Sequence, residues 1–175
     1  MKKLIVGSLV LLFVLIVGAG GISAYHLSTS SPVTLIVYMS SDESPILLRW
    51  GAEKALYAFH PSEDDVQQLN AEAGARYAAL YPDQSKADKL LGHFLENGVD
   101  VNAIDRASGS GVTALHSAVL ERNPYAVRLL LEHGADAGMA GAQGRTPLDF
   151  AEMLQDQDPG ADIAEIILLL EPAQS

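Results

Sequence analysis

The side chains that could perform catalysis or bind a metal are scattered along this sequence. Its five histidines include no His-x-x-x-His pair and no zinc-ligand spacing with a flanking glutamate. Asp156, Asp158 and Asp162 alternate as calcium ligands do, but no bidentate glutamate follows, which favours a solvated turn. The glycine-serine-glycine run at 109–111 lacks the lysine of a phosphate-binding loop. The sequence therefore predicts a protein that is not an enzyme and holds no metal and no cofactor.

The composition restricts the partners further. The 175 residues carry 22 acidic against 11 basic side chains and no cysteine, which excludes disulfides and thiolate metal sites. A net charge of −11 repels the phosphates of nucleic acids, so we expect no nucleic-acid binding and favour a basic protein as the partner. The length suits one modest domain with a leader, and we expect a monomer when no partner is bound.

A leader is predicted over residues 1–25. Lys2 and Lys3 precede an uncharged stretch of 21 residues, 4–24, which is long enough to cross a bilayer. The first alternative is therefore a single membrane anchor. The second is a cleaved signal peptide, because small residues at 17–21 could form a cleavage site. Under either alternative the chain after Tyr25 is exported. The predicted location is a bacterial inner membrane, facing the periplasm, or the periplasm itself if the leader is removed.

The segment that follows the leader is predicted to be a linker, residues 26–43. Within it, residues 33–39 are rich in β-branched and aromatic side chains, which favours one short strand. Residues 44–82 show helical spacing, and they form either a helical cap or a degenerate repeat unit. Trp50 and Tyr57 are expected in the core of these capping helices. Ser62 and Asp65 resemble a capping box that opens one helix ending near Pro82.

The second half of the chain repeats itself. The motif at 113–118, TALHSA, returns at 146–151 as TPLDFA with an offset of 33 residues. The run at 129–136, LLLEHGAD, is matched upstream at 93–100, HFLENGVD. Threonine fits the capping position of a helix, and Gly98 and Gly134 lie where a helix end needs a left-handed residue. These residues predict a repeated unit built from short helices.

These motifs resemble those of the ankyrin-repeat family. The resemblance implies an all-α ankyrin-repeat solenoid over residues 83–172, with an N-terminal helical cap and about three repeats. It implies that His116 bonds backbone groups between repeats, while Asp149 occupies that position in the last repeat. The glycine that usually joins the two helices of a repeat is replaced at 122–124, where Asn123 is expected to take the turn.

The resemblance also implies a function. Ankyrin arrays bind proteins through the tips of their hairpins and the exposed face of each first helix. The candidate contact residues here are Ile104, Asp105, Arg106, Ser117, Leu120, Glu121, Met139, Gln143, Arg145 and Phe150. The leading hypothesis is an exported protein-binding module, in its sharpest version an immunity protein that neutralises a secreted toxin. The alternative is a cell-envelope scaffold that organises membrane proteins.

Overall fold

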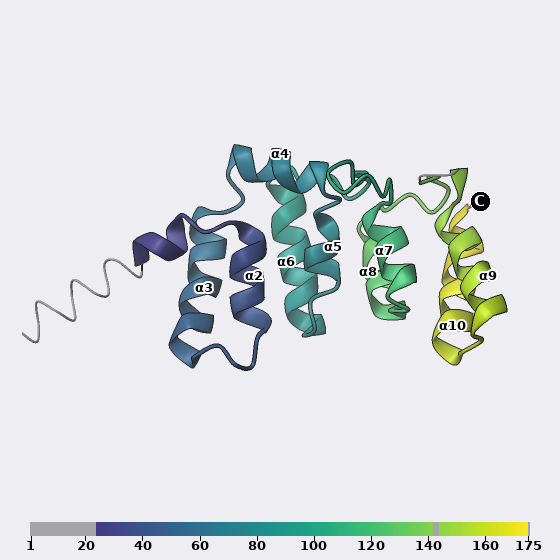
Figure 1. The fold of residues 1–175 in the computed structure, drawn as a ribbon, viewed down its shortest axis with the longest axis horizontal. Coiled ribbons are helices and arrows are strands. Elements are labelled where there is room, and N and C mark those ends of the chain that lie inside the picture. The colour runs from purple at the N-terminus through teal and green to yellow at the C-terminus, as the bar shows by residue number, and fades with distance from the viewer. Residues whose placement is uncertain (1–23, 142–143, 175) are drawn as a thin grey trace, which may run out of the picture. The chain divides into compact units, whose positions relative to one another are not determined.

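The computed structural model describes residues 24–141 and 144–174. It divides into two compact units, one ending at His60 and the other beginning at Pro61 (Figure 1). The predicted leader, apart from residues 24 and 25, lies outside the described residues. Among the residues that are described, no helix combines the length and the apolar character needed to cross a bilayer.

The first unit is helical, and the strand predicted at 33–39 is wrong. Residues 24–28 are helical, and α2 (Pro32–Ser40) and α3 (Ile46–Phe59) pack against each other. Pro32 occupies the first turn of α2, and the Ser31 hydroxyl accepts a hydrogen bond from the Thr34 N–H as its cap. The buried Pro32, Leu35, Ile36 and Met39 recur at helical spacing. Capping and packing against α3 therefore outweigh the β-propensity of the segment.

The expectation that Trp50 and Tyr57 belong to a core is also wrong. Both side chains are exposed, Trp50 at 63% and Tyr57 at 38% of their surface. The face of α3 that is buried carries Ala52, Ala55 and Leu56 instead. The aromatic residues of α3 therefore lie outside its buried face.

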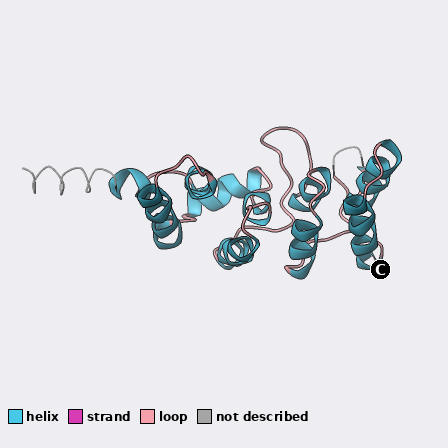
Figure 2. Ribbon diagram, turned by 90° about the horizontal axis from the view of Figure 1, so that it is seen from below, coloured by secondary structure: helices cyan, strands magenta, loops and turns pink. Residues whose placement is uncertain are grey.

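Within the described residues, the second unit contains seven α-helices and a short 3-10 helix. Figure 2 shows these residues as helices and loops, without a strand. The elements are α4 (Glu63–Ala71), α5 (Ala75–Ala79), α6 (Gln84–Glu96), α7 (Ala114–Leu120), α8 (Pro124–Glu132), α9 (Pro147–Gln157), α10 (Ala161–Leu170) and η2 (Pro172–Gln174).

Three helix pairs stack in the second unit. Each pair consists of a first helix, α5, α7 or α9, packed on the second helix that follows it, α6, α8 or α10. The first helices also contact one another in sequence, and α8 contacts α10 (Figure 1). Gly98 and Gly134 adopt φ values of 97° and 85° just after α6 and α8, as the sequence predicts for helix ends. Thr113 and Thr146 cap α7 and α9 with capping boxes, as expected.

The single helix predicted from Ser62 to Pro82 is broken in two. Its capping box is confirmed, because the Ser62 hydroxyl and the Asp65 carboxylate bond each other's backbone N–H. However, α4 ends at Ala71, and Ala73 adopts a left-handed φ of 52°. The Gly74 N–H then donates to the Leu69 carbonyl at 2.7 Å. A Cβ atom on Gly74 would lie only 2.6 Å from the Cβ of Leu69, so the turn requires glycine.

Two glycines of this unit should respond in opposite ways to substitution by alanine. Gly74→Ala should lower the free energy of unfolding by about 2 kcal/mol, because the added methyl group collides with the buried Leu69. Gly92 lies inside α6 with open space around it, so Gly92→Ala should raise the free energy of unfolding by about 0.5–1 kcal/mol. Urea titrations of the two variants measure both effects. Equal effects would contradict this description of the α4–α5 turn.

The turn between α7 and α8 differs from the expectation. Arg122, not Asn123, takes the left-handed conformation, with a φ of 51°. Asn123 instead caps α8 by accepting the Ala126 N–H. The Arg122 guanidinium donates to the Asp162 carboxylate at 2.7 Å and to the Asp158 carboxylate at 2.6 Å. The arginine therefore joins this turn to the turn between α9 and α10 in the next repeat, which glycine could not do.

Candidate functional site

The long loop between α6 and α7 contains a buried ion pair. The Asp105 side chain is almost fully buried, and its carboxylate accepts hydrogen bonds from the Arg76 guanidinium at 3.0 Å and the Ser108 hydroxyl at 2.7 Å. Burial by itself raises the pKa of Asp105, but the bonds from Ser108 and Arg76 outweigh it and lower the pKa to about 2. The Arg106 and Ala107 N–H groups both donate to the Ala71 carbonyl, so the loop is fixed to the end of α4.

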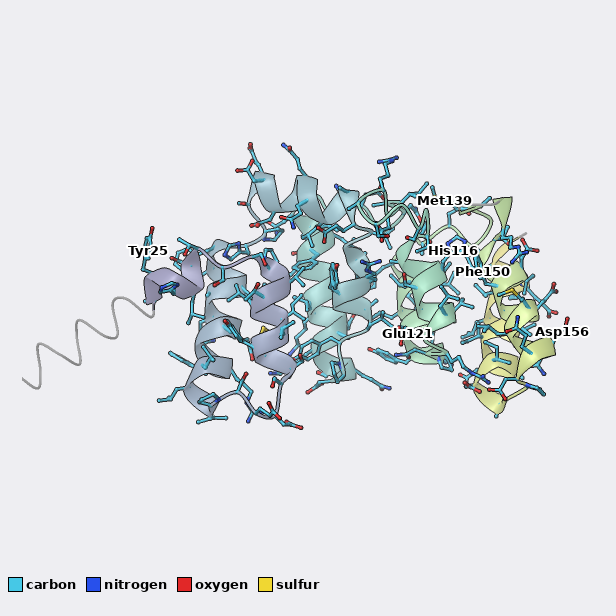
Figure 3. All side chains as sticks on the ribbon, in the orientation of Figure 1. Tyr25, His116, Glu121, Met139, Phe150 and Asp156 are labelled. Atoms are coloured by element: carbon cyan, nitrogen blue, oxygen red, sulfur yellow. The ribbon has the colours of Figure 1, made fainter. Side chains whose placement is uncertain are left out.

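His116 connects two repeats, as the sequence predicts. Its Nδ1 faces the Thr113 N–H at 3.3 Å and the Thr113 hydroxyl at 2.8 Å, while Nε2 lies 3.0 Å from the Arg145 carbonyl. We assign the proton to Nε2, because a carbonyl can only accept a hydrogen bond. The ring also packs edge-on against Phe150 of α9, with their centroids 5.5 Å apart (Figure 3). A Cβ atom on Gly141 would lie 3.1 Å from Nε2, which explains the small residue there.

His116 should make the stability of the fold depend on pH. Burial lowers the pKa of His116 below its ordinary 6.5, and the bond to Arg145 offsets part of that effect. The pKa of His116 is lower in the folded than in the unfolded protein. Neutral His116 therefore contributes its full stabilisation above pH 6.5, and this stabilisation is lost as the pH falls through the folded pKa. His116→Ala should lower the free energy of unfolding by about 3 kcal/mol at neutral pH and reduce this dependence. Urea titrations from neutral to mildly acid pH measure it, and an unchanged pH slope in the variant would contradict the assignment.

The exposed face of α9 carries three acidic side chains, at positions 149, 152 and 156. A surface hollow of about 500 Å³ is lined by Arg145, just before α9, and by Asp149, Glu152, Met153, Asp156 and Gln157, which follow one another at helical spacing along α9. Asp149 accepts the Thr146 N–H at 2.7 Å, and this bond lowers its pKa. Glu152 and Asp156 are exposed, and no hydrogen bond or ion pair of either side chain is found among the described residues. We call Asp149, Glu152 and Asp156 the acidic face of α9.

The ten predicted contact residues occupy different environments. Arg106, Leu120, Glu121 and Arg145 are exposed, and Leu120 exposes 43% of its surface. Half-buried positions are held by Ile104, Ser117, Met139 and Phe150. Gln143 lies outside the described residues.

Asp105 stands apart from the other predicted contact residues. Its carboxylate bonds Arg76 and Ser108 inside the loop, so it is not offered to a partner at the surface. We therefore assign Asp105 a structural role.

Glu152 and Asp156 are not among the ten contact residues predicted from the sequence, where Asp156 appears only as a possible calcium ligand. Both could have been found from the spacing of acidic residues along the helix that Thr146 opens, because 149, 152 and 156 share one helical face. The other aspartates of the calcium alternative, Asp158 and Asp162, bind the Arg122 guanidinium. In the part of the chain that the structure describes, no group of three carboxylate or imidazole side chains is placed to hold a metal ion.

Comparison with known families identifies the fold. The model "Ankyrin repeats (3 copies)" matches residues 76–172, more than half of the chain. These residues coincide with the three helix pairs α5–α6, α7–α8 and α9–α10 and the turns between them. This chain belongs to the ankyrin-repeat family.

Several known proteins are similar to part of this chain. Potassium channel AKT3 of Oryza sativa subsp. japonica is 45% identical over 84 residues, 48% of this chain and 9% of the channel. Potassium channel AKT1 of Arabidopsis thaliana is 41% identical over 70 residues, 40% of this chain and 8% of the channel. An ankyrin repeat-containing protein of Schizosaccharomyces pombe is 34% identical over 70 residues, 40% of this chain and 32% of that protein. The similarity thus spans a minor part of each relative.

Proposed function

We propose that this chain is a protein-binding module whose acidic face of α9 captures a basic segment of a partner protein. Ankyrin repeats imply protein partners. The observation that carries the finer proposal is the pair of exposed carboxylates, Glu152 and Asp156, beside a surface hollow on a first helix. Opposite charges on the two proteins speed their association and select against acidic partners.

Apolar side chains on the adjacent first helices α7 and α9 give the proposed interface its anchors. Leu120 is exposed at the end of α7, and Phe150 and Met153 are half-buried on α9. Interfaces draw most of their binding energy from a few such apolar anchors, and the charged rim sets orientation. A partner that fits carries lysine or arginine side chains around a small apolar patch.

Capture from cell envelopes with the full-length protein tests this proposal. We expect a stoichiometric partner that is released by high salt and has a basic surface, because salt screens exposed charges beyond about 8–10 Å. A partner that stays bound in high salt or is acidic would contradict the proposal. The same capture with Glu152→Lys/Asp156→Lys is expected to lose the partner.

The finer function that we propose depends on residues 1–25. If that leader exports the chain, the acidic face of α9 is presented in the periplasm, anchored or free. We propose that the partner there is a secreted toxin and that this chain neutralises it as an immunity protein. The support is the combination of a predicted export signal with a small acidic binding module. Assays of the captured enzyme with and without this chain test the idea, and a captured set of resident membrane proteins would favour the scaffold instead.

A further inference from the structure

The described part of the first unit, residues 24–60, presents an apolar groove at its surface. The groove has a volume of about 400 Å³ and is lined mainly by Ala24, Leu27, Leu47, Trp50, Lys54 and Phe59. Leu47 exposes 78% of its surface, Trp50 63% and Phe59 59%. Gly51 shapes the groove, because a Cβ atom there would lie 2.9 Å from the Leu27 Cδ1 and displace that side chain from α3.

Exposed apolar side chains are concentrated in this unit. Of the large apolar residues that are markedly exposed among the described residues, seven lie between 25 and 59 and two, Leu120 and Leu168, lie beyond His60. A contiguous exposed patch of this kind marks a surface that something else covers.

The net negative charge, in contrast, is concentrated in the second unit. Residues 24–60 contain two basic and three acidic side chains, a net charge of −1. Residues 61–175 contain seven basic and 19 acidic side chains, a net charge of −12. Repulsion from an anionic lipid surface is therefore concentrated in the ankyrin repeats, and the groove itself carries the cationic Lys54.

The position of the groove along the chain indicates what covers it. Ala24, which lines the groove, is the last residue of the predicted membrane-spanning stretch 4–24. If this stretch crosses a bilayer, Ala24 lies at the membrane–water interface, and the side chains that line the groove with it must lie there too. Trp50, and Tyr25, which follows Ala24 in the sequence and exposes 68% of its surface, are of the residue types enriched at that depth. Lys54 can extend its ammonium group to lipid phosphates while its methylene chain stays in the apolar layer.

We infer that the apolar groove of α3 rests in the interfacial layer of a lipid bilayer, next to the point where the leader leaves the membrane. This inference rests on the anchored alternative for residues 1–25 and does not involve the acidic face of α9. The occupant is the boundary between lipid headgroups and acyl chains, into which an amphipathic face sinks by about 5–10 Å.

Trp50 is the only tryptophan of the chain, so its fluorescence reports on the groove alone. The full-length protein is reconstituted in vesicles of equal parts phosphatidylcholine and phosphatidylglycerol, with lipids brominated either near the glycerol or near the methyl end of the acyl chain. We expect blue-shifted emission and quenching at least about twofold stronger by the shallow bromines, because the side chain lies near the headgroups. Acrylamide added to the water should quench weakly.

Two variants decide the test. Leu47→Asp/Phe59→Asp changes two exposed residues, so we expect unchanged circular dichroism, a loss of bromine quenching and a gain in acrylamide quenching. Leu168→Asp, at a leucine of α10 that exposes 69% of its surface, is the matched control and should change neither. Capture of the basic partner should be the same for all three proteins, which separates this test from that of the proposed function.

Three results would overturn the inference. Strong acrylamide quenching in vesicles would place Trp50 in water. Emission shielded from both quenchers and dependent on the ratio of protein to lipid would place a second copy over the groove. Emission shielded from both quenchers at every dilution would mean that residues 1–23 of the same chain cover it.

Discussion

Asp105→Asn should lower the free energy of unfolding by about 2–3 kcal/mol at neutral pH. The carboxylate is buried and accepts three hydrogen bonds, from the Arg76 guanidinium and from the Ser108 N–H and hydroxyl. The side-chain amide of the asparagine cannot accept all three hydrogen bonds. It is also uncharged, so the Arg76 guanidinium loses its counter-charge. The lowered pKa alone, about 2 against an ordinary 3.8, corresponds to about 2 kcal/mol.

The stability difference between wild-type protein and Asp105→Asn should depend on pH. Because the folded pKa of Asp105 is depressed, its contribution is fully present above about pH 4 and is lost as the pH falls toward 2. Wild-type protein and Asp105→Asn should therefore converge in stability below pH 4. Arg106→Ala, at the exposed neighbouring residue, should change the free energy of unfolding by less than about 0.5 kcal/mol. Urea titrations at several pH values measure this, and a constant difference at all pH values would contradict the ion pair.

Glu152→Lys/Asp156→Lys should weaken binding of the captured basic partner by more than about tenfold. The double variant turns two attractive contacts of the acidic face of α9 into repulsive ones, and like charges across an interface cost several kcal/mol. Both side chains are exposed and lie outside the core, so the fold should be retained. Calorimetric titration of the purified partner at low and high salt measures the change. The loss should shrink in high salt, because these charges are screened.

A charge-matched control is available on the second helices. Glu96 and Glu132 are exposed in the last turns of α6 and α8, where lysine suits the helix dipole. Glu96→Lys/Glu132→Lys changes the net charge by the same amount and should leave the Kd within about twofold of wild type. If both double variants weaken binding equally, the overall charge of the protein decides affinity, and the acidic face of α9 is not the site.

Features that depend on neighbours in the sequence were predictable. The caps at Ser62, Thr113 and Thr146 each involve a partner three residues away, so the motif alone indicates them. The role of His116 was available through the ankyrin resemblance, and its bond to the Arg145 carbonyl confirms it.

Features that depend on tertiary contacts were not predictable. The segment 33–39 has high β-propensity, but the face that it packs against α3 makes it helical. The burial of Asp105 follows from Arg76, 29 residues earlier, which no local pattern shows. The exposure of Trp50 has the same origin, because α2 covers the alanine face of α3 and leaves the aromatic residue outside.

The most direct test of the account is a comparison of photo-crosslinking from two positions in the full-length protein. A photoreactive amino acid replaces Glu152 on the acidic face of α9 in one variant and Glu132 on α8 in the other, and each is irradiated with cell envelopes. We predict that one basic protein is crosslinked from position 152 at low salt, is lost at high salt, and is not crosslinked from position 132. Equal crosslinking from both positions, or crosslinking from 132 alone, would contradict the assignment of partner binding to the acidic face of α9.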